Sequence, residues 1–540
     1  MNWNRKFSHS DYLALSMLLF CGIKVLWGIM HHVDVMMTDD AGYMTLASYF
    51  PKNLFIIQFG PLYTTALRFI QIFTHDPVYV YYILLSIMTV LPSLSLYYFL
   101  RKAGNLMPIW AFVFSLCFLL STENMLFATW SRISHFSISV ALLGLGWLSG
   151  ENSPSKLLYK GLLLTFFLGF IRPEYHVGFF LLLGFSVLYW SLVANALPDI
   201  AIRKPLFIFL FLALAFSAVM SPLKGTRSYE AFSQQFTFNY CEWHKLSYYN
   251  FADWEIIANA NFGKFNKLSQ AYEHNPPIFT KHLLYNVEQY FHKGIIAIRE
   301  VILPSKVFPI STIAAWVLII VLLFVILLIS KKRKLPYINH PWVYSVVVLS
   351  LTLPSVAASI LYYSREHYRI LAVPFFYYLI LLIIGKCELP FSTKQIKYAG
   401  IIIATIILLR LPTVGDYPTQ DLWHTYKHQT NLAAIKLARS LHISDTLVNT
   451  NHEGGLNIFL QTYAKNIDPR KKEEKEPFTS FLQSNHINSV YYTTAYDHNF
   501  RYRNDSSWHD FLSSPERYNF RRYDIPNTEG RLYISNILLQ

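Results

Sequence analysis

The segment 311–330 (STIAAWVLIIVLLFVILLIS) constrains this chain most, because it has no polar face that a helix could present to water. A helix needs about 20 consecutive apolar residues to cross the hydrocarbon core of a bilayer. Charged residues make up 14% of the chain, whereas soluble domains usually carry about 25%. We therefore predict an α-helical polytopic membrane protein with about eleven transmembrane helices, rather than a soluble protein with buried helices. The eleven apolar runs lie near 12–30, 78–98, 106–121, 133–149, 157–171, 176–196, 206–221, 308–330, 341–361, 369–386 and 397–411.

The net charge of +14 is distributed unevenly over the linkers between these runs. One alternating set of linkers carries 15 Lys and Arg residues, whereas the opposing short linkers carry six. Because Lys and Arg accumulate in cytoplasmic linkers, we predict a cytoplasmic N-terminus and a periplasmic or extracellular C-terminus in a plasma (inner) membrane. The first run contains Lys24 and precedes no small-residue cleavage site, which indicates a retained helix. The charge is thus explained by topology, and no basic stripe with interleaved aromatics indicates a nucleic-acid partner.

The predicted topology divides the chain into two domains. Residues 1–411 form the transmembrane bundle, with exterior loops at 31–77 and 222–307, and residues 412–540 form an exterior soluble domain long enough to bury its own core. Aromatic residues are frequent in the second loop, where they either stack on sugar faces or pack against the bundle. These residues are Tyr229, Phe232, Phe236, Phe238, Tyr240, Trp243, Tyr248, Tyr249 and Trp254.

The C-terminal region combines short strand patterns with amphipathic helix patterns and is predicted to be a small α/β domain. The charged run 470–476 (RKKEEKE) is typical of a solvated surface loop. The expected elements are strands at 445–450 and 488–494 and helices near 423–441 and 477–485.

An acidic pair, Asp39-Asp40, follows the first apolar run. Two adjacent carboxylates repel each other, so one has a raised pKa or the two share a cation. Alternatively, Thr38 or Asp39 caps a helix that starts near Ala41. The apolar stretches 43–50 and 61–73 that follow are broken by prolines, and we expect helices in the membrane interface there.

Several other ionisable residues lie at the predicted exterior ends of the helices. Arg132 and His135 are one helical turn apart and can face the same cavity. Alternatively, His135 is a helix-end residue whose hydrogen bonds are satisfied locally. Arg172 and Glu174 occupy a tight turn and are candidates for a functional role. Alternatively, Pro173 between them only starts the following helix. Arg365 and Arg369 fit phosphate oxygens or lipid headgroups, and Lys24 either approaches such a phosphate or extends to the interface. These residues are Lys24, Arg132, His135, Arg172, Glu174, Arg365 and Arg369.

The order of these features resembles the GT-C superfamily of polyprenyl-phosphate-dependent glycosyltransferases, which includes protein O-mannosyltransferases and the lipid A aminoarabinose transferase. Asp39-Asp40-Ala41 is similar to the acidic motif in the first exterior loop of that family. Tyr363-Ser364-Arg365-Glu366-His367-Tyr368-Arg369, followed by Pro374, is similar to its Arg-rich entry to a late span.

The resemblance implies an inverting transfer of a sugar from a polyprenyl-phosphate donor to a hydroxyl of a glycan, lipid or protein acceptor. It implies that Asp39 is the base, that Asp40 supports it or binds a metal, and that Arg365 and Arg369 bind the departing phosphate. The sequence requires no cofactor, and the acidic pair is able to accommodate a divalent cation. The other charged residues named above are candidates for supporting roles.

Two other functions are compatible with this sequence. An O-antigen ligase or polymerase-type enzyme, which uses a polyprenyl-diphosphate glycan, would need no base in the first exterior loop. A secondary transporter would place ionisable residues near the bilayer midplane. Here the ionisable residues gather at one face, so transport is the less favoured function.

Overall fold

The computed structural model describes most of the chain. The described residues are 7–37, 39–52, 60–125, 132–193, 200–219, 227–246, 253–329, 331–332, 340–362, 366–385, 387–388, 392–417, 430–441, 447–451, 454–460 and 465–539.

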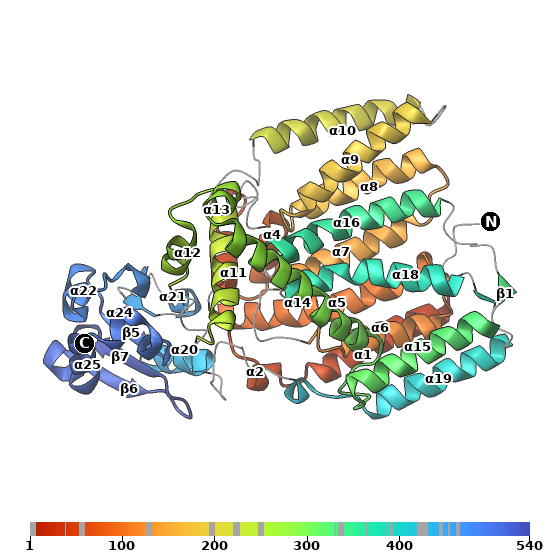
Figure 1. The fold of residues 1–540 in the computed structure, drawn as a ribbon. Coiled ribbons are helices and arrows are strands. Elements are labelled where there is room, and N and C mark those ends of the chain that lie inside the picture. The colour runs from red at the N-terminus through yellow and green to blue at the C-terminus, as the bar shows by residue number, and fades with distance from the viewer. Residues whose placement is uncertain are drawn as a thin grey trace.

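A bundle of apolar helices forms the larger part of the molecule (Figure 1). Each of the eleven apolar runs coincides with a helix, which confirms their helical character. Four stretches of the described chain are long and apolar enough to cross a membrane: His9–His32, Pro77–Lys102, Tyr175–Leu192 and Pro341–Leu361. A polytopic membrane protein is consistent with these helices, and the number of crossings stays a prediction. The eleven helices are α1 (His9–Val25), α5 (Pro77–Lys102), α6 (Pro108–Leu119), α7 (Ile133–Leu148), α8 (Pro154–Gly169), α9 (Tyr175–Leu192), α10 (Ile200–Val219), α15 (Thr312–Ile329), α16 (Pro341–Leu361), α18 (Val373–Gly385) and α19 (Thr393–Leu409).

The N-terminal end of the bundle is held by a buried ion pair. Arg101, at the end of α5, binds the carboxylate of Asp11 in the first turn of α1, and Tyr97 donates a hydrogen bond of 2.8 Å to the same carboxylate. Asp11 has no exposed surface. The start of α1 and the C-terminal domain lie at opposite ends of the molecule (Figure 1). A two-residue ladder between β1 (Lys331–Lys332) and β2 (Cys387–Glu388) lies at the N-terminal extreme.

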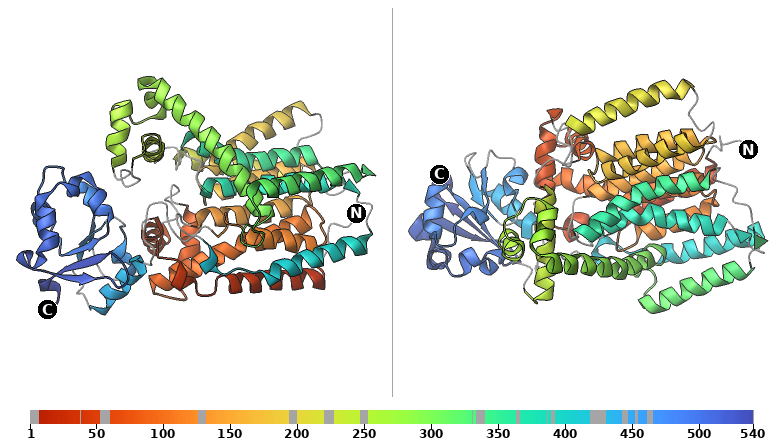
Figure 2. Two further views of the ribbon diagram at one scale, coloured as in Figure 1. Left: turned by 60° about the horizontal axis from the view of Figure 1, so that its bottom comes forward. Right: turned by 45° about the horizontal axis from the view of Figure 1, so that its top comes forward.

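Short helices cover the other end of the bundle, which we call the domain-facing end because it faces the C-terminal domain (Figure 2). The helices expected at 43–50 and 61–73 are observed as α3 (Asp39–Ser48) and α4 (Pro61–Gln71). The expected exterior loop 222–307 is largely helical rather than irregular. It contains α11 (Arg227–Trp243), α12 (Trp254–Phe262), α13 (Leu268–His274) and the long α14 (Pro276–Ile302), and the domain-facing end also carries α2 (Ile29–His32) and α17 (Glu366–Arg369).

Aromatic residues of this helical loop form an apolar core of their own. Phe232 and Phe236 on α11 are fully buried and pack against Phe262 and Phe279. Of the two alternatives for these rings, packing therefore holds for Phe232 and Phe236. Tyr248 and Tyr249 lie outside the described residues.

The C-terminal region is a small α/β domain, as predicted. Its five strands have the order β4-β3-β5-β7-β6, with β3 parallel to β4 and β5 and the other neighbours antiparallel. Both strands and both helices that the sequence predicts are present in the described parts of their ranges, whereas β4, β6 and β7 were not predicted. The elements are α20 (Thr430–Ser440), β3 (Val448–Thr450), α21 (Leu456–Leu460), β4 (Lys465–Ile467), α22 (Phe478–Ser484), β5 (Ser489–Tyr492), α23 (Ala495–His498), α24 (Phe500–Arg503), α25 (Ser506–Ser513), β6 (Phe520–Asp524) and β7 (Arg531–Ser535).

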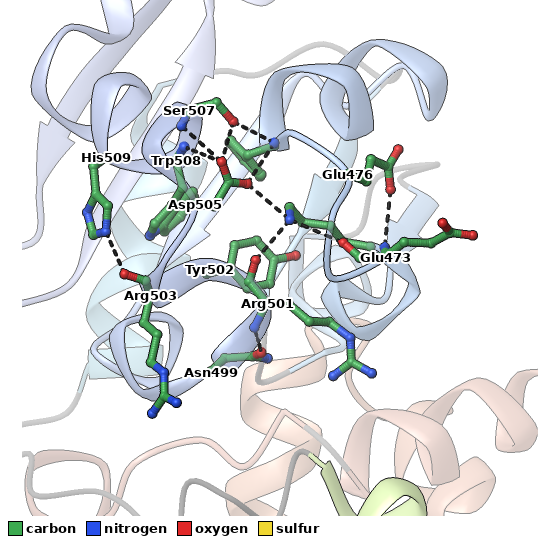
Figure 3. Close-up of polar contacts among 12 residues, drawn as sticks. Glu473, Glu476, Asn499, Arg501, Tyr502, Arg503, Asp505, Ser507, Trp508 and His509 are labelled. Carbon is green, nitrogen blue, oxygen red and sulfur yellow. Dashed lines mark hydrogen bonds and ion pairs between the residues drawn. The ribbon is translucent and has the colours of Figure 1, made fainter.

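The prediction of a solvated loop at 470–476 is wrong for Lys472, which is only 1% exposed. Its ammonium lies 3.0 Å from a carboxylate oxygen of Asp505 and 2.8 Å from the carbonyl oxygen of Arg501. Asp505 also caps α25 by accepting hydrogen bonds from the backbone of Ser507 and Trp508 (Figure 3). The charge pattern alone did not reveal that one lysine of the run is needed to neutralise a buried helix cap.

Candidate active site

The acidic pair opens helix α3, and its two side chains have different surroundings. α3 begins at Asp39, two residues earlier than the expected start near Ala41. Asp39 is exposed, whereas Asp40 is 6% exposed and points into the protein. Thr38, the alternative capping residue, lies outside the described residues. The pair therefore presents one hydrated and one buried carboxyl group on adjacent positions.

Burial dominates the electrostatics of Asp40. Loss of hydration and the neighbouring carboxylate of Asp39 raise the pKa of Asp40 to about 8, and the positive charge of Arg132 opposes this shift. Tyr63 on α4 is fully buried near Asp40, and burial raises the pKa of its phenol well above the ordinary value. Asp40 is thus mostly protonated at neutral pH, and Asp39 is the carboxyl group of the pair that is open to an incoming molecule.

Arg132 and His135 lie together, as their spacing predicts. Nη1 of Arg132 is 2.7 Å from Nε2 of His135 and donates a hydrogen bond of 2.8 Å to the carbonyl oxygen of Asn124. Asn124 is itself fully buried and donates through Nδ2 to the carbonyl oxygens of Thr89 and Leu119. The sequence contains no signal for Asn124, a neutral residue beside Glu123 in the turn after α6.

Arg172 contacts residues from two distant parts of the chain. Its guanidinium pairs with Glu174 at 2.8 Å, donates to the hydroxyl of Ser134 on α7 and stacks over the ring of Tyr368 at 4.9 Å. Arg172 is 6% exposed. The alternative that Pro173 merely starts the next helix does not account for these contacts.

Arg369 is also buried, and its guanidinium lies 3.4 Å from the carboxylate of Glu123. Its short helix α17 and the turn after it pack against α7. Arg365, its predicted companion, lies outside the described residues. Lys24 lies on the last turn of α1 with an exposed side chain.

A buried polar cluster holds the end of α16, from which the segment with Arg369 departs. Asn286 on α14 donates to the carbonyl oxygens of Ile360 and Tyr362, and His282 contacts that of Leu361 at 3.3 Å. Asn239 on α11 joins both side chains, at 2.9 Å from His282 and 2.7 Å from Asn286. Burial lowers the pKa of His282 to about 4, so the ring is neutral at pH 7. These residues satisfy helix-terminal carbonyls that would otherwise lack partners.

The structure thus brings together the acidic pair, Arg132 with His135, Arg172 with Glu174, and Arg369 at the domain-facing end of the bundle. Three of these are buried guanidinium groups, which can bind a phosphate through paired N–H donors. Within the described chain, no three His, Cys, Asp or Glu side chains are grouped so that they could hold a metal ion. The divalent cation expected from the sequence stays a prediction, with Asp39 and Asp40 as its candidate ligands.

Comparison with known proteins adds no assignment to this geometry, because the sequence matches no protein-family model and no curated protein.

Proposed function

We propose that this protein is an inverting glycosyltransferase that moves a sugar from a polyprenyl-phosphate donor to an acceptor hydroxyl at the exterior face of the membrane. One observation carries the proposal: an exposed carboxylate and a buried carboxyl group lie at the same end of the bundle as three buried arginines. A transfer from a lipid phosphate needs a base for the acceptor and positive charge for the leaving group.

The reaction follows from these groups. The Asp39 carboxylate accepts the proton of the acceptor hydroxyl, and the acceptor oxygen forms a bond to the anomeric carbon of the donor sugar. The bond between that carbon and the phosphate oxygen breaks, and its electron pair remains on the polyprenyl phosphate. In this mechanism Arg369 and Arg172 stabilise the additional negative charge, with Arg132 near Asp40. Attack opposite to the leaving group inverts the configuration of the sugar.

Cells with and without the protein provide the first experiment. Loss of the protein is expected to leave the polyprenyl-phosphate sugar unused and to remove one modification from a surface glycan, lipid or protein, as measured by mass spectrometry of lipid extracts and envelope fractions. If neither the carrier-linked sugar nor any envelope component changes, the proposal is wrong.

The double variant Asp39→Asn/Asp40→Asn separates this function from a ligase that uses a polyprenyl-diphosphate glycan. A ligase needs no base in the first exterior loop and would retain its activity. Transfer by the proposed mechanism would be lost. Wild-type activity of the double variant would therefore favour the ligase.

Replacing Tyr368 tests the arginine part of the site. Tyr368→Leu removes the ring under Arg172, and we expect the KM for the lipid-linked donor to rise about threefold to tenfold, as expected for a partly buried cation–π contact. Tyr368→Phe retains the ring and is the matched control, with a KM close to that of the wild type. Equal KM values for both variants would contradict a role of this stack in donor binding.

A further inference from the structure

The extended segment 33–37, just before the acidic pair, is clamped by helix α5. Val33, Val35 and Met37 are buried. On the α5 side, Tyr82 donates a hydrogen bond of 2.7 Å to the carbonyl oxygen of Val33, and Tyr81 donates one of 3.2 Å to that of Asp34. Both bonds go to backbone oxygens, and the Asp34 side chain points towards the C-terminal domain.

Asp34 acts as the N-terminal cap of α20 in the C-terminal domain. Its two carboxylate oxygens accept hydrogen bonds of 2.8 Å from the backbone nitrogens of Asn431 and Leu432. The Asn431 side chain in turn donates to the carbonyl oxygen of Val35 and accepts a hydrogen bond from Tyr491 on β5. The first turn of α20, whose N–H groups would otherwise lack partners, is therefore satisfied by a residue of the bundle.

Gly455 brings the same domain against the start of α3. It has a φ of +63°, and a Cβ atom there would collide with the carbonyl oxygen of Met37 and with Ala41. Ala41 directly follows the acidic pair. One apolar core continues from Met37 and Ala41 into Leu432 and Phe459 of the C-terminal domain, so no solvent layer separates the domain from α3.

Further along α20, an ion pair also holds the C-terminal domain against the bundle. Arg439 binds both carboxylate oxygens of Asp76, at 2.8 and 2.9 Å, and Asp76 caps the start of α5. The C-terminal domain is therefore bound to segment 33–37 through Asp34 and to the start of α5 through Asp76.

We infer that the C-terminal domain completes the candidate site: α20 and the Gly454-Gly455 turn hold segment 33–37, and thereby the Asp39–Asp40 pair, with Asp34 as the positioning residue. The inference deepens the proposed function and rests on it only for the part that the pair plays in transfer. A domain that merely tethered an acceptor would not need to cap its own helix with a bundle residue.

Amide hydrogen exchange over segment 33–37 and helix α3 reports whether the acidic pair is held in place. The purified full-length protein is exchanged in deuterated buffer at pH 7, without donor or acceptor. Mass spectrometry then measures the exchange of peptides that cover residues 33–48.

In Asp34→Asn and in the milder Asn431→Ala, segment 33–37 loses contacts with α20, and the amides of residues 33–48 are expected to exchange at least tenfold faster than in the wild type. Asp253→Asn is the matched control, because it breaks the 3.0 Å contact between Arg501 and Asp253 at the start of α12 and leaves segment 33–37 untouched. Its exchange over residues 33–48 is expected to stay at the wild-type rate.

Wild-type exchange over residues 33–48 in Asn431→Ala would overturn the inference even if Asp34→Asn does not fold. Equally fast exchange of these residues in Asp253→Asn would also overturn it, because any loosening of the domain would then suffice. Since hydrogen exchange needs no substrate, failure of the transfer experiments would leave this result standing, and failure here would leave the proposed chemistry open.

Discussion

Replacing Asp39 with Asn is expected to lower the rate of sugar transfer by about 10²–10⁴-fold, the usual contribution of a general base. Asp39→Asn keeps the size of the exposed side chain and removes only its ability to accept a proton. At neutral pH, Asp40→Asn is expected to retain activity within about tenfold of the wild type, because Asn resembles the protonated carboxyl group that burial favours there. Initial rates of both variants with the lipid-linked donor test this difference.

The raised pKa of Asp40 also predicts that the stability of the fold depends on pH. The folded protein holds the pKa of Asp40 at about 8, above its ordinary value of 3.8. Burial of the neutral form therefore stabilises the fold fully below pH 3.8, and this contribution is lost as the pH rises through 8. Asp40→Asn avoids that loss, so its melting temperature should exceed that of the wild type above pH 8, by less than about 2 °C for each kcal/mol in a chain of 540 residues.

Two results would contradict this assignment. A loss of activity in Asp40→Asn as large as in Asp39→Asn would show that Asp40 acts as an anion, as a cation ligand would. Identical melting temperatures of Asp40→Asn and the wild type at pH 9 would show that Asp40 is not protonated in the folded protein at lower pH.

The second large effect is expected at the opposite end of the bundle. Asp11→Ala leaves Arg101 without its carboxylate partner, and we expect a loss of about 3–5 kcal/mol in the free energy of unfolding. The thermal unfolding midpoint of the protein in detergent measures the loss. Glu151→Gln is the matched control, because the Glu151–Lys160 pair is partly exposed and is expected to contribute less than about 1 kcal/mol. Similar midpoints for the two variants would contradict the structural importance of the buried pair.

The helices of the bundle could be predicted from the sequence because a run of apolar residues is a local signal. The run at 311–330 and helix α15 agree without any knowledge of their neighbours. The helices of loop 222–307 could not be predicted in the same way, because polar and charged residues interrupt the apolar residues of α14. His282 and Asn286 of α14 contact carbonyl oxygens at the end of α16, and the sequence does not show that these groups are neighbours.

The candidate site was predictable where its residues are close in the sequence. Arg132 and His135 are three residues apart, and Arg172 and Glu174 are two apart, so each pair meets by local geometry. Contacts across the chain had no such signal: Arg369 pairs with Glu123, and Arg172 stacks on Tyr368. The different surroundings of Asp39 and Asp40 likewise depend on which face of α3 the rest of the protein covers.

The cap that Asp34 provides for α20 also determines when, during synthesis, the acidic pair can be held in place. The capped nitrogen of Asn431 follows Asp34 by 397 residues. At about 5–20 residues per second, the ribosome needs roughly 20–80 s to make the intervening chain. During that interval segment 33–37 has emerged without its partner helix, so the acidic pair reaches its final arrangement only after α20 has been made. A chain that stops before α20 would carry every residue of the acidic motif and still present it unassembled.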